Sequence, residues 1–278
     1  FDVVPREIVP KAVAYNVMGN SSMRVLGPAI AGFLIAAIGA AGNFFIQGIL
    51  YLGSGLLAFL VVFPPKKPKE GKISAWGELK EGFRYVAKDR TTRLLMTITS
   101  IQYFLLVPVF NTLFPVYAKD IFEVGPEGLG LMFTFVGVGG VIGAWSASQL
   151  MRFDRVGLIQ SGAMLIYCTA LVGLALSPNF YLALAMCGLA GGAEMVNSVN
   201  NQTMLQLSAP PEMRGRVVSL IQLNPALIAS GSLIAGSLGD FLGAPGACMV
   251  VSAASAALIL VLLMVSPHLR SLRLSKYR

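Results

Sequence analysis

Histidine, cysteine and charged residues are scarce in this chain. Its 278 residues include one histidine and three cysteines, and only 12% are charged. A Ser/His/Asp triad, a histidine metal site or a haem site would have to be built on His268 alone. Cys168, Cys187 and Cys248 are odd in number and lie far apart in apolar stretches, which argues against a disulfide or a metal set. We therefore expect that the protein is not an enzyme and that it binds no metal or cofactor.

Nucleotide-binding sequences are missing as well. No G-x-x-x-x-G-K-[S/T] loop occurs, and the glycines at 137–140 lie in an apolar stretch where no strand-to-helix phosphate cradle forms. ATP-driven chemistry is therefore not expected. A net charge of +8 would suit nucleic acid, but the basic residues lie beside the ends of apolar stretches and not along one soluble face. We expect no nucleic-acid partner.

Apolar residues, in contrast, make up 55% of the chain. Soluble domains carry about 25% charged residues, so this composition indicates a protein buried in lipid. Eight apolar stretches each approach the roughly 20 residues that a helix needs to cross a bilayer. They cover residues 13–38, 43–63, 94–118, 128–150, 157–177, 180–206, 217–242 and 246–266. The sequence predicts an all-α polytopic membrane protein with eight transmembrane helices.

The basic residues predict how these helices are oriented. Nineteen of the 21 Lys and Arg residues fall into every second gap between apolar stretches; Lys119 lies in the alternate gaps and Arg24 inside a stretch. Cationic loops resist translocation and stay in the cytoplasm. Both ends of the chain are therefore expected to be cytoplasmic.

One long polar segment divides the chain unevenly. Two predicted spans precede it and six follow. We interpret residues 1–64 as the last two helices of an amino-terminal bundle, 65–93 as a cytoplasmic linker, and 94–278 as a six-helix bundle with a basic tail. Secondary transporters are commonly built from matched repeats, so four further helices would be missing at the front. Because the chain opens with Phe1, we interpret it as a piece of something longer.

The linker carries an amphipathic pattern. Apolar side chains recur in it at helical spacing, with charged residues between them. These apolar residues are Trp76, Leu79, Phe83 and Val86. The pattern predicts a short helix lying on the cytoplasmic interface.

Glu194 is the only acidic residue well inside a predicted span. Asn197 and Asn201 share its helix face at i+3 and i+7, with Ser198 at i+4 and Asn200 nearby. A carboxyl group in apolar surroundings resists ionisation and exchanges protons closer to neutral pH than an exposed one. Glu194, Asn197 and Asn201 are therefore candidates for handling protons or substrate. A permanently paired acid, or a polar cluster that locks helices together, is the open alternative.

A second polar stripe lies in the first predicted span. Asn16, Asn20 and Arg24 stack at i, i+4 and i+8 on one helix face. A cation within hydrocarbon costs several kcal/mol, so Arg24 should face protein or a water-filled cavity. The alternative is an arginine that snorkels or only packs helices.

Glycines and prolines indicate close helix contacts. Gly27, Pro28 and Gly32 would let a neighbouring helix approach the first span, and Pro28 removes a backbone hydrogen bond. Gly139 and Gly143, four residues apart in the fourth span, offer a matching surface. Ordinary tight packing and a role in gating are both compatible with this pattern.

The third predicted span combines polar residues with helix breakers. Gln102 and Asn111 lie in it together with Pro108 and Pro115. This combination predicts a broken, partly polar helix that lines a cavity.

Four segments together resemble the major facilitator superfamily, most closely its bacterial drug, macrolide and siderophore exporters. They are the R-x-x-G-P-x-x-x-G pattern within Asn16–Gly32, Leu79–Val86, Asp154-Arg155-Val-Gly157, and Pro211–Val217. The resemblance implies that the eight helices correspond to spans five to twelve of a twelve-span fold. It also implies that the chain is truncated at its amino end.

The resemblance also implies roles for single residues. The Gly27-Pro28 element is similar to the family's antiporter motif, which implies export by exchange. Asp154, Arg155 and Gly157 resemble the second copy of a cytoplasmic-loop motif whose charges clamp helix ends and influence switching.

The predicted third and sixth spans would line the central cavity of such a transporter. This places Gln102, Asn111, Glu194 and Asn197 at the transport path.

The function implied is proton-coupled efflux of an amphipathic small molecule, such as a drug or siderophore, by alternating access. Its setting would be the bacterial inner membrane, and the partners would be a small-molecule substrate, protons and the lipid bilayer. The missing amino-terminal four helices would be required for transport. The alternatives are an uncoupled facilitator or importer, and a non-transporting eight-span membrane scaffold.

Overall fold

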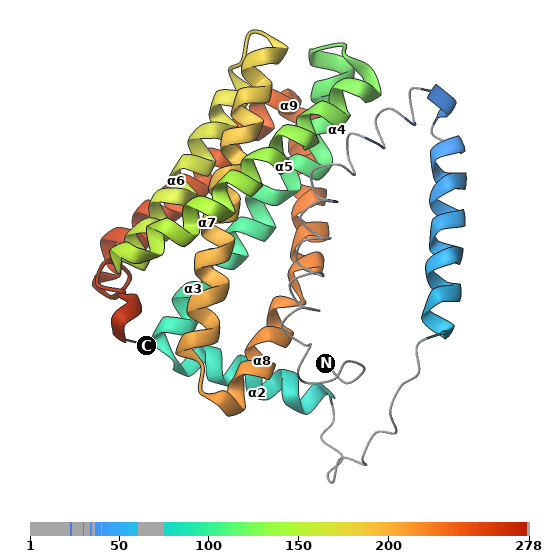
Figure 1. Cartoon of the computed structure of the whole chain (residues 1–278). Helices are drawn as coiled ribbons and strands as arrows, with labels where there is room; N and C mark the ends of the chain where they lie inside the picture. Colours follow the sequence, from blue (N-terminus) through green and yellow to red (C-terminus); the bar gives the residue numbers. More distant parts are fainter. Residues whose placement is uncertain are drawn as a thin grey trace. The chain divides into compact units, whose positions relative to one another are not determined.

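A computed structural model describes Met23, Ile30, Leu34 and residues 37–39, 41–60 and 75–276. The described chain is helical throughout its regular elements (Figure 1). It divides into two compact units, residues 1–72 with 124–134, and residues 73–123 with 135–278. The boundary near Lys72 falls within the predicted linker, whereas the grouping of 124–134 with the first unit was not anticipated. The assignment of 1–64 and 94–278 to two bundles stays a prediction.

In the first unit, the helix Ala41–Phe59 is long and apolar enough to cross a membrane. It matches the predicted second span within a few residues. Its large apolar side chains are exposed, including Phe44 and Phe59. The predicted first span, 13–38, lies largely outside the described residues.

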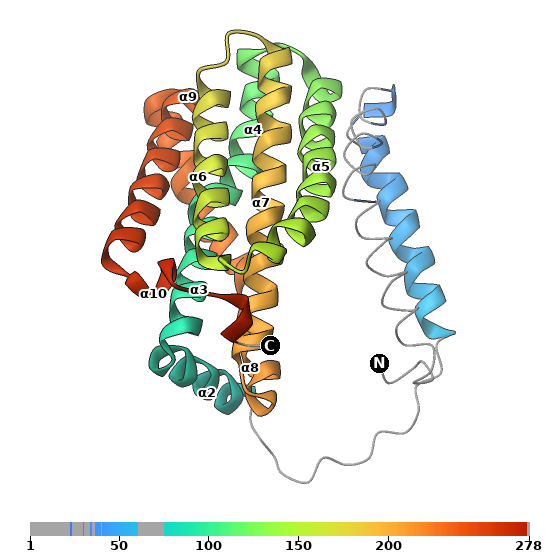
Figure 2. The ribbon, with the colours of Figure 1, turned by 60° about the vertical axis from the view of Figure 1, so that its left-hand side comes forward.

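The second unit holds the other predicted membrane spans. They are α3 (Arg90–Ile101) with its continuation to Ile121, α5 (Gly125–Leu150) from residue 135 onward, α6 (Val156–Ala175), α7 (Phe180–Ser208) and α9 (Asn224–Val265). In both ribbon views α6 and α7 lie side by side (Figures 1 and 2). Each of these spans was predicted from the apolar stretches, and the all-α membrane fold is confirmed.

Most of the last two predicted spans, 217–242 and 246–266, forms the two arms of α9, whereas residues 217–221 belong to α8. Gly243 interrupts it with φ 72° and ψ 162°, a conformation that glycine adopts without steric penalty. The first arm packs on the third span, because a Cβ at Gly231 would lie 1.9 Å from the Phe104 carbonyl oxygen. The second arm packs on α6, where the Cys248 thiol donates to the Leu171 carbonyl oxygen at 3.3 Å. The interruption at Gly243 thus falls in the gap between the apolar stretches 217–242 and 246–266.

The third span is irregular, as its prolines predict. After α3, three π-helical segments follow, Gln102–Leu106 (η1), Val109–Leu113 (η2) and Tyr117–Ile121 (η3), with the short α4 (Phe114–Val116) before the last. Pro108 stands directly before η2, and Pro115 lies in α4. Proline lacks an N–H and cannot make the regular helical hydrogen bond, so the ladder shifts register here.

Short elements gather at one end of the second unit, and we call them the end layer. They are α2 (Ala75–Lys88), α8 (Pro211–Ile221), α10 (Pro267–Arg270) and η5 (Leu274–Lys276). The ribbon views show α2 and α8 near the carboxyl terminus (Figures 1 and 2). The helix predicted within the polar linker is thus present as α2. A core containing Leu95, Met204 and Leu272 joins this layer to α3 and α7.

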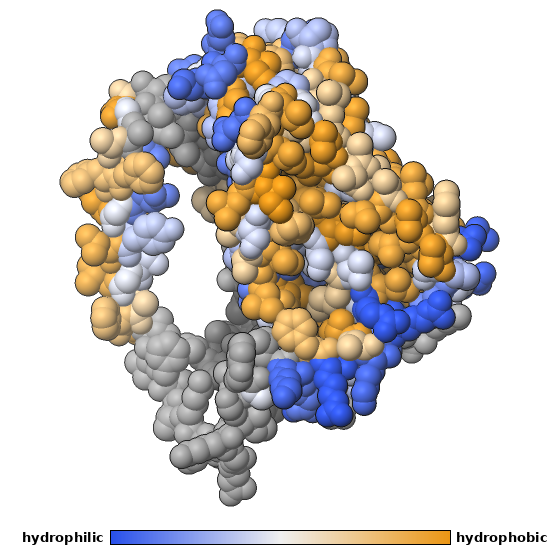
Figure 3. All heavy atoms as spheres, turned by 180° about the vertical axis from the view of Figure 1, so that it is seen from behind, coloured by the Kyte–Doolittle hydropathy of each residue, from blue (hydrophilic) through white to orange (hydrophobic). Residues whose placement is uncertain are grey.

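The surface follows the same division. In the space-filling view, apolar side chains cover the middle of the second unit and hydrophilic ones gather toward its ends (Figure 3). Exposed large apolar residues such as Ile142, Leu233 and Val261 belong to its spans. An apolar surface of this kind suits contact with lipid, so the chain is an integral membrane protein.

Candidate functional site

Polar side chains from three spans meet inside the second unit, and we call them the central polar network. Its members are Thr99, Gln102, Gln160, Asn197, Ser198 and Asn201. They come from the third span, α6 and α7. The sequence predicted Gln102, Asn197 and Asn201 as site residues, and the structure brings these three together with partners from neighbouring helices.

The first half of the network joins the third span to α7. The Asn197 side-chain nitrogen donates to the Gln102 side-chain oxygen. The Gln102 nitrogen in turn donates to Ser198 Oγ at 3.1 Å. Gln102 begins the π-helical segment η1, so the irregular backbone and this contact coincide. π-helical turns inside α-helices occur frequently at functional sites.

The second half lies one turn further along α7. The Asn201 side-chain nitrogen donates to Thr99 Oγ1, and its oxygen accepts from the Gln160 side-chain nitrogen at 2.8 Å. Thr99 Oγ1 also donates to the Leu95 carbonyl oxygen at 3.0 Å. Asn201 therefore connects all three spans. Thr99 and Gln160 were not predicted, although a single glutamine in the apolar run of α6 was a signal that could have found Gln160.

Most of the network is buried in this structure, and Ser198 is half-buried. Gln102 is 2% exposed, and Asn197 and Gln160 are fully buried. Some polar atoms in the network and beside it have no hydrogen-bond partner among the described residues. These are Asn197 Oδ1 and Gln160 Oε1 in the network, and both side-chain amide atoms of the neighbouring Asn200. Buried polar atoms are normally paired, and unpaired ones in a native structure call for an explanation.

Glu194 lies on the same buried face of α7, three residues before Asn197, and is 6% exposed. Asn111, in η2, is exposed and is not part of the network. The other predicted polar and packing residues of the first span lie outside the described residues. These are Asn16, Asn20, Arg24, Gly27, Pro28 and Gly32.

Glycines bring α5 and α7 into direct backbone contact. A Cβ at Gly139 would lie 1.8 Å from the Gly188 carbonyl oxygen, and one at Gly143 would lie 2.2 Å from that of Gly192. From the other side, a Cβ at Gly191 would lie 2.1 Å from the Val136 carbonyl oxygen. Small residues allow such close approach between membrane helices. Gly139 and Gly143 thus pack on α7, and their glycine partners there were not predicted.

The turn between α5 and α6 binds the carboxy-terminal tail. The Asp154 carboxylate accepts from the Ser275 backbone nitrogen at 2.7 Å and from Ser275 Oγ at 2.8 Å. The Asp154 carbonyl oxygen accepts from the Leu274 nitrogen at 3.1 Å. The hydrogen bonds from the Ser275 backbone and side chain lower the pKa of Asp154, and the positive charge of Arg273 adds to this effect. Asp154 has φ 58°, a left-handed conformation that Asp tolerates better than most residues.

Gly157 completes this contact. A Cβ there would lie 1.9 Å from the Leu269 carbonyl oxygen, and its backbone nitrogen donates to the Leu272 carbonyl oxygen at 3.4 Å. Arg155, between Asp154 and Gly157, is exposed. The Asp154–Gly157 segment therefore holds the tail against the bundle, a contact that sequence reasoning did not predict.

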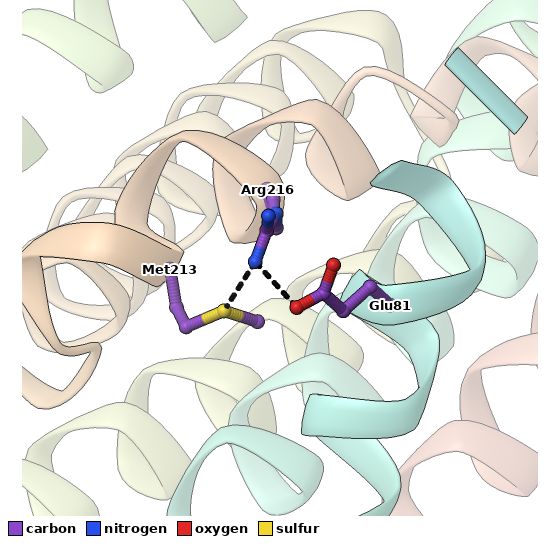
Figure 4. Close-up of polar contacts among 3 residues, drawn as sticks. All are labelled: Glu81, Met213 and Arg216. Carbon is purple, nitrogen blue, oxygen red and sulfur yellow. Dashed lines mark hydrogen bonds and ion pairs between the residues drawn. The ribbon is translucent and has the colours of Figure 1, made fainter. Parts of the chain in front are cut away.

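An ion pair joins α2 and α8 of the end layer. These helices contain Leu79–Val86 and Pro211–Val217, two of the segments that resemble the major facilitator superfamily. Arg216 of α8 contacts Glu81 of α2 at 2.7 Å and also lies 3.1 Å from the Met213 sulfur (Figure 4). Gly82 allows the helices to approach, since its Cβ would lie 3.4 Å from the Arg216 carbonyl oxygen. The sequence placed Leu79–Val86 in the linker helix and Pro211–Val217 between the sixth and seventh predicted spans, whereas the structure packs these two segments together.

The cysteines are free and buried, as predicted for small apolar residues. The described part of the chain contains no group of three or more His, Cys, Asp or Glu residues that could hold a metal ion.

Comparison with known proteins places this arrangement in a family. The pattern of the family described as "transmembrane secretion effector" matches residues 1–276. The multidrug efflux pump Tap of Mycolicibacterium fortuitum is 26% identical over 255 residues, which cover 90% of this chain and 62% of Tap. The enterobactin exporter EntS of Shigella flexneri is 28% identical over 243 residues, which cover 85% of this chain and 56% of EntS. The chain therefore spans roughly three-fifths of the length of these relatives.

The fold has a solved counterpart. A bacterial homologue of the human lysosomal transporter Spinster, in an inward-facing and unoccupied conformation, matches with a TM-score of 0.65 and 16% identity. The match covers 97% of this chain and 71% of that one. The family and these relatives are transporters and not enzymes. With its membrane spans and the family pattern along nearly its whole length, the chain belongs to the transmembrane secretion effector family of the major facilitator superfamily.

Proposed function

We propose that the full-length protein is a secondary exporter that moves an amphipathic small molecule across the bacterial inner membrane in exchange for protons. Tap and EntS, both efflux proteins by name, support export. In this proposal a further four helices precede the present chain, both of its ends are cytoplasmic, and the transport path lies between two six-helix halves.

The observation that carries the proposal is the hydrogen bonding of Gln102 to Asn197 and Ser198, which ties the third span to α7. Both partners are neutral, so the contact can open without exposing a charge to the membrane interior. The unpaired amide atoms of Asn197 and Asn200 offer further hydrogen bonds to water or to polar groups of a substrate. A change in the packing of these two spans would expose these unpaired amide atoms to the transport path.

Glu194 is the proposed proton carrier. It is buried on the same face of α7 as Asn197, and it is the acidic residue deepest in the described spans. Protonation removes its charge, which lowers the cost of moving it through a closed, dry state. Release of the proton on the other side would then couple the pH gradient to the change of access.

The test uses the full-length protein in proteoliposomes with an imposed pH gradient. We expect Glu194→Gln to abolish gradient-driven efflux of a fluorescent drug while leaving drug binding within about threefold, since Gln keeps the size of the side chain. Asp240→Asn, at an exposed position of α9, is the matched control and should retain efflux.

Each other outcome has a definite meaning. Gradient-driven efflux that is unchanged in Glu194→Gln would remove Glu194 from proton coupling. Wild-type transport that is insensitive to an uncoupler would favour a facilitator or importer. If the full-length protein bound the drug but did not transport it, the alternative of a non-transporting membrane scaffold would be favoured.

A further inference from the structure

An apolar groove lies between α5 and α6 and is floored by α7. Its volume is about 700 Å³, within the range of ligand sites, and its lining runs from Phe135 to Leu150 on α5. At 1.5 Å per residue, the groove is about 22 Å long. It is therefore longer than the hydrocarbon part of one leaflet, which is half of a core of roughly 30 Å. Ser146 is the one polar side chain among the described residues that line it.

The groove is open along its side. Ile142 is 59% exposed, and Ile166 and Leu189 are each 47% exposed. Its depth comes from glycines: Gly139 and Gly143 bring α5 onto α7, and Gly162 on α6 leaves open space, since a Cβ there would meet nothing within 4 Å. A recess of this kind in a membrane span accepts an apolar chain, because its lining offers almost no hydrogen-bonding group.

Positive charge lies at one end of the groove. The lining ends at Leu150 on α5 and Ile159 on α6, and the connection between these helices carries Arg152 and Arg155. Both arginines are exposed, and neither makes an ion pair with another described residue. The one carboxylate of this connection, Asp154, is turned to Ser275. Basic sites at the membrane surface between helices bind anionic lipid headgroups.

We propose that the groove binds one anionic phospholipid, with an acyl chain along α5 and α6 and the headgroup phosphate at Arg152 and Arg155. The apolar lining of the groove suits the acyl chain, and the positive charge at its end suits the anionic headgroup. This site is separate from the central polar network and does not depend on the proposed transport activity.

Lipid binding to the full-length protein tests the proposal. Native mass spectrometry in detergent would measure the apparent affinity for phosphatidylglycerol and for phosphatidylcholine. We expect tighter binding of phosphatidylglycerol, weakened roughly fivefold for each cation removed in Arg152→Gln and Arg155→Gln. The matched control is the pair Lys88→Gln and Arg90→Gln, which removes two exposed charges from elsewhere in the same unit and should change affinity less than twofold.

A second pair of variants tests the groove itself. Gly162→Trp fills the open space and should reduce bound phosphatidylglycerol at least fivefold, whereas Ala257→Trp, on an exposed face of α9, should not. Equal affinity for the two lipids, or equal binding by the two Trp variants, would overturn the proposal. So would a Gly162→Trp protein with unchanged lipid binding and lowered thermal stability, because a protein segment would then occupy the groove. If Gly162→Trp does not fold, Gly162→Leu and the arginine variants decide.

Discussion

The middle of the second unit and its end layer join their helices by different means. In the middle, the contacts are glycine backbones and neutral amides, as in Gly139 against Gly188 and Asn201 between Thr99 and Gln160. In the end layer the contacts include charged groups, as in Glu81 with Arg216, and in Ser275 of η5 with Asp154 of the turn between α5 and α6. A charge in hydrocarbon costs several kcal/mol, whereas near water it is solvated and screened. Substitutions in the middle should therefore cost more than those in the end layer.

The largest effect is expected at the glycine contact. Gly139→Ala places a methyl group 1.8 Å from a backbone oxygen of α7, which requires the two helices to separate. We expect a loss of about 3 kcal/mol or more of stability, seen as a lower thermal unfolding temperature in detergent. Gly140→Ala is the control, because the nearest atoms would lie 3.8 Å from the added Cβ. The unfolding temperature of this variant should therefore stay unchanged. Equal losses in the two variants would mean that α5 and α7 do not touch at Gly139.

The central polar network should show the next largest effect. Asn201→Ala removes the partner of the Gln160 nitrogen and leaves it buried. We expect a loss of about 1 to 2 kcal/mol in the same unfolding assay. Asn111→Ala removes an exposed amide of the third span and should change stability by less than about 0.5 kcal/mol. If Asn201→Ala were as stable as Asn111→Ala, the network would not hold the spans together.

The Asp154 contact should show a local effect. Asp154→Ala removes both hydrogen bonds to Ser275, so the tail should be cleaved faster by protease while the bundle stays intact. Asp240→Ala serves as the control. Cleavage rates that match in the two variants would argue against the tail contact.

The same contact carries a pH dependence. The pKa of Asp154 is lowered in the folded protein. Asp154 therefore stabilises the bound tail fully at pH values above the ordinary pKa of an Asp side chain. That contribution is lost as the pH falls through the lowered value. Tail protection in the wild type should therefore persist at neutral pH and disappear in strong acid, which proteolysis by an acid-active protease can measure.

The smallest effect is expected at the exposed ion pair. Glu81 is 53% exposed, and Glu81→Gln should change stability by about 0.5 kcal/mol or less. The difference from wild type should shrink further at high salt, where surface charges are screened. Lys80→Gln, one residue away and exposed, is the control. A loss as large as that of Asn201→Ala would contradict the difference between the two regions.

Much of the fold could be predicted from the sequence. The apolar stretches predicted the described spans, Pro108 and Pro115 predicted the irregular third span, and the gap between the stretches 217–242 and 246–266 predicted the break in α9. These features depend on local chemistry, namely hydropathy, a missing N–H and a permitted positive φ. The candidate site was predicted only in part: Gln102, Asn197 and Asn201 were named, but Thr99 and Gln160 were not.

The partners could not be predicted because they depend on how helices face one another. Nothing near Asn201 in the sequence indicates that Gln160, 41 residues away, lies beside it. The same holds for Asp154 and Ser275, 121 residues apart. Asn111 is exposed and outside the network, so its predicted place at the transport path stays a prediction.

The sequence by itself determined that this is a membrane protein, roughly where its described spans lie, and which polar residues lie within them. Hydrocarbon forces every backbone group into helical hydrogen bonds, so composition and length suffice for that much. Only the tertiary structure decided which glycines touch, which amides pair, and that the carboxy-terminal tail binds the Asp154 turn. Those contacts depend on the rotation and depth of each helix against its neighbours, and these follow from packing over the whole bundle.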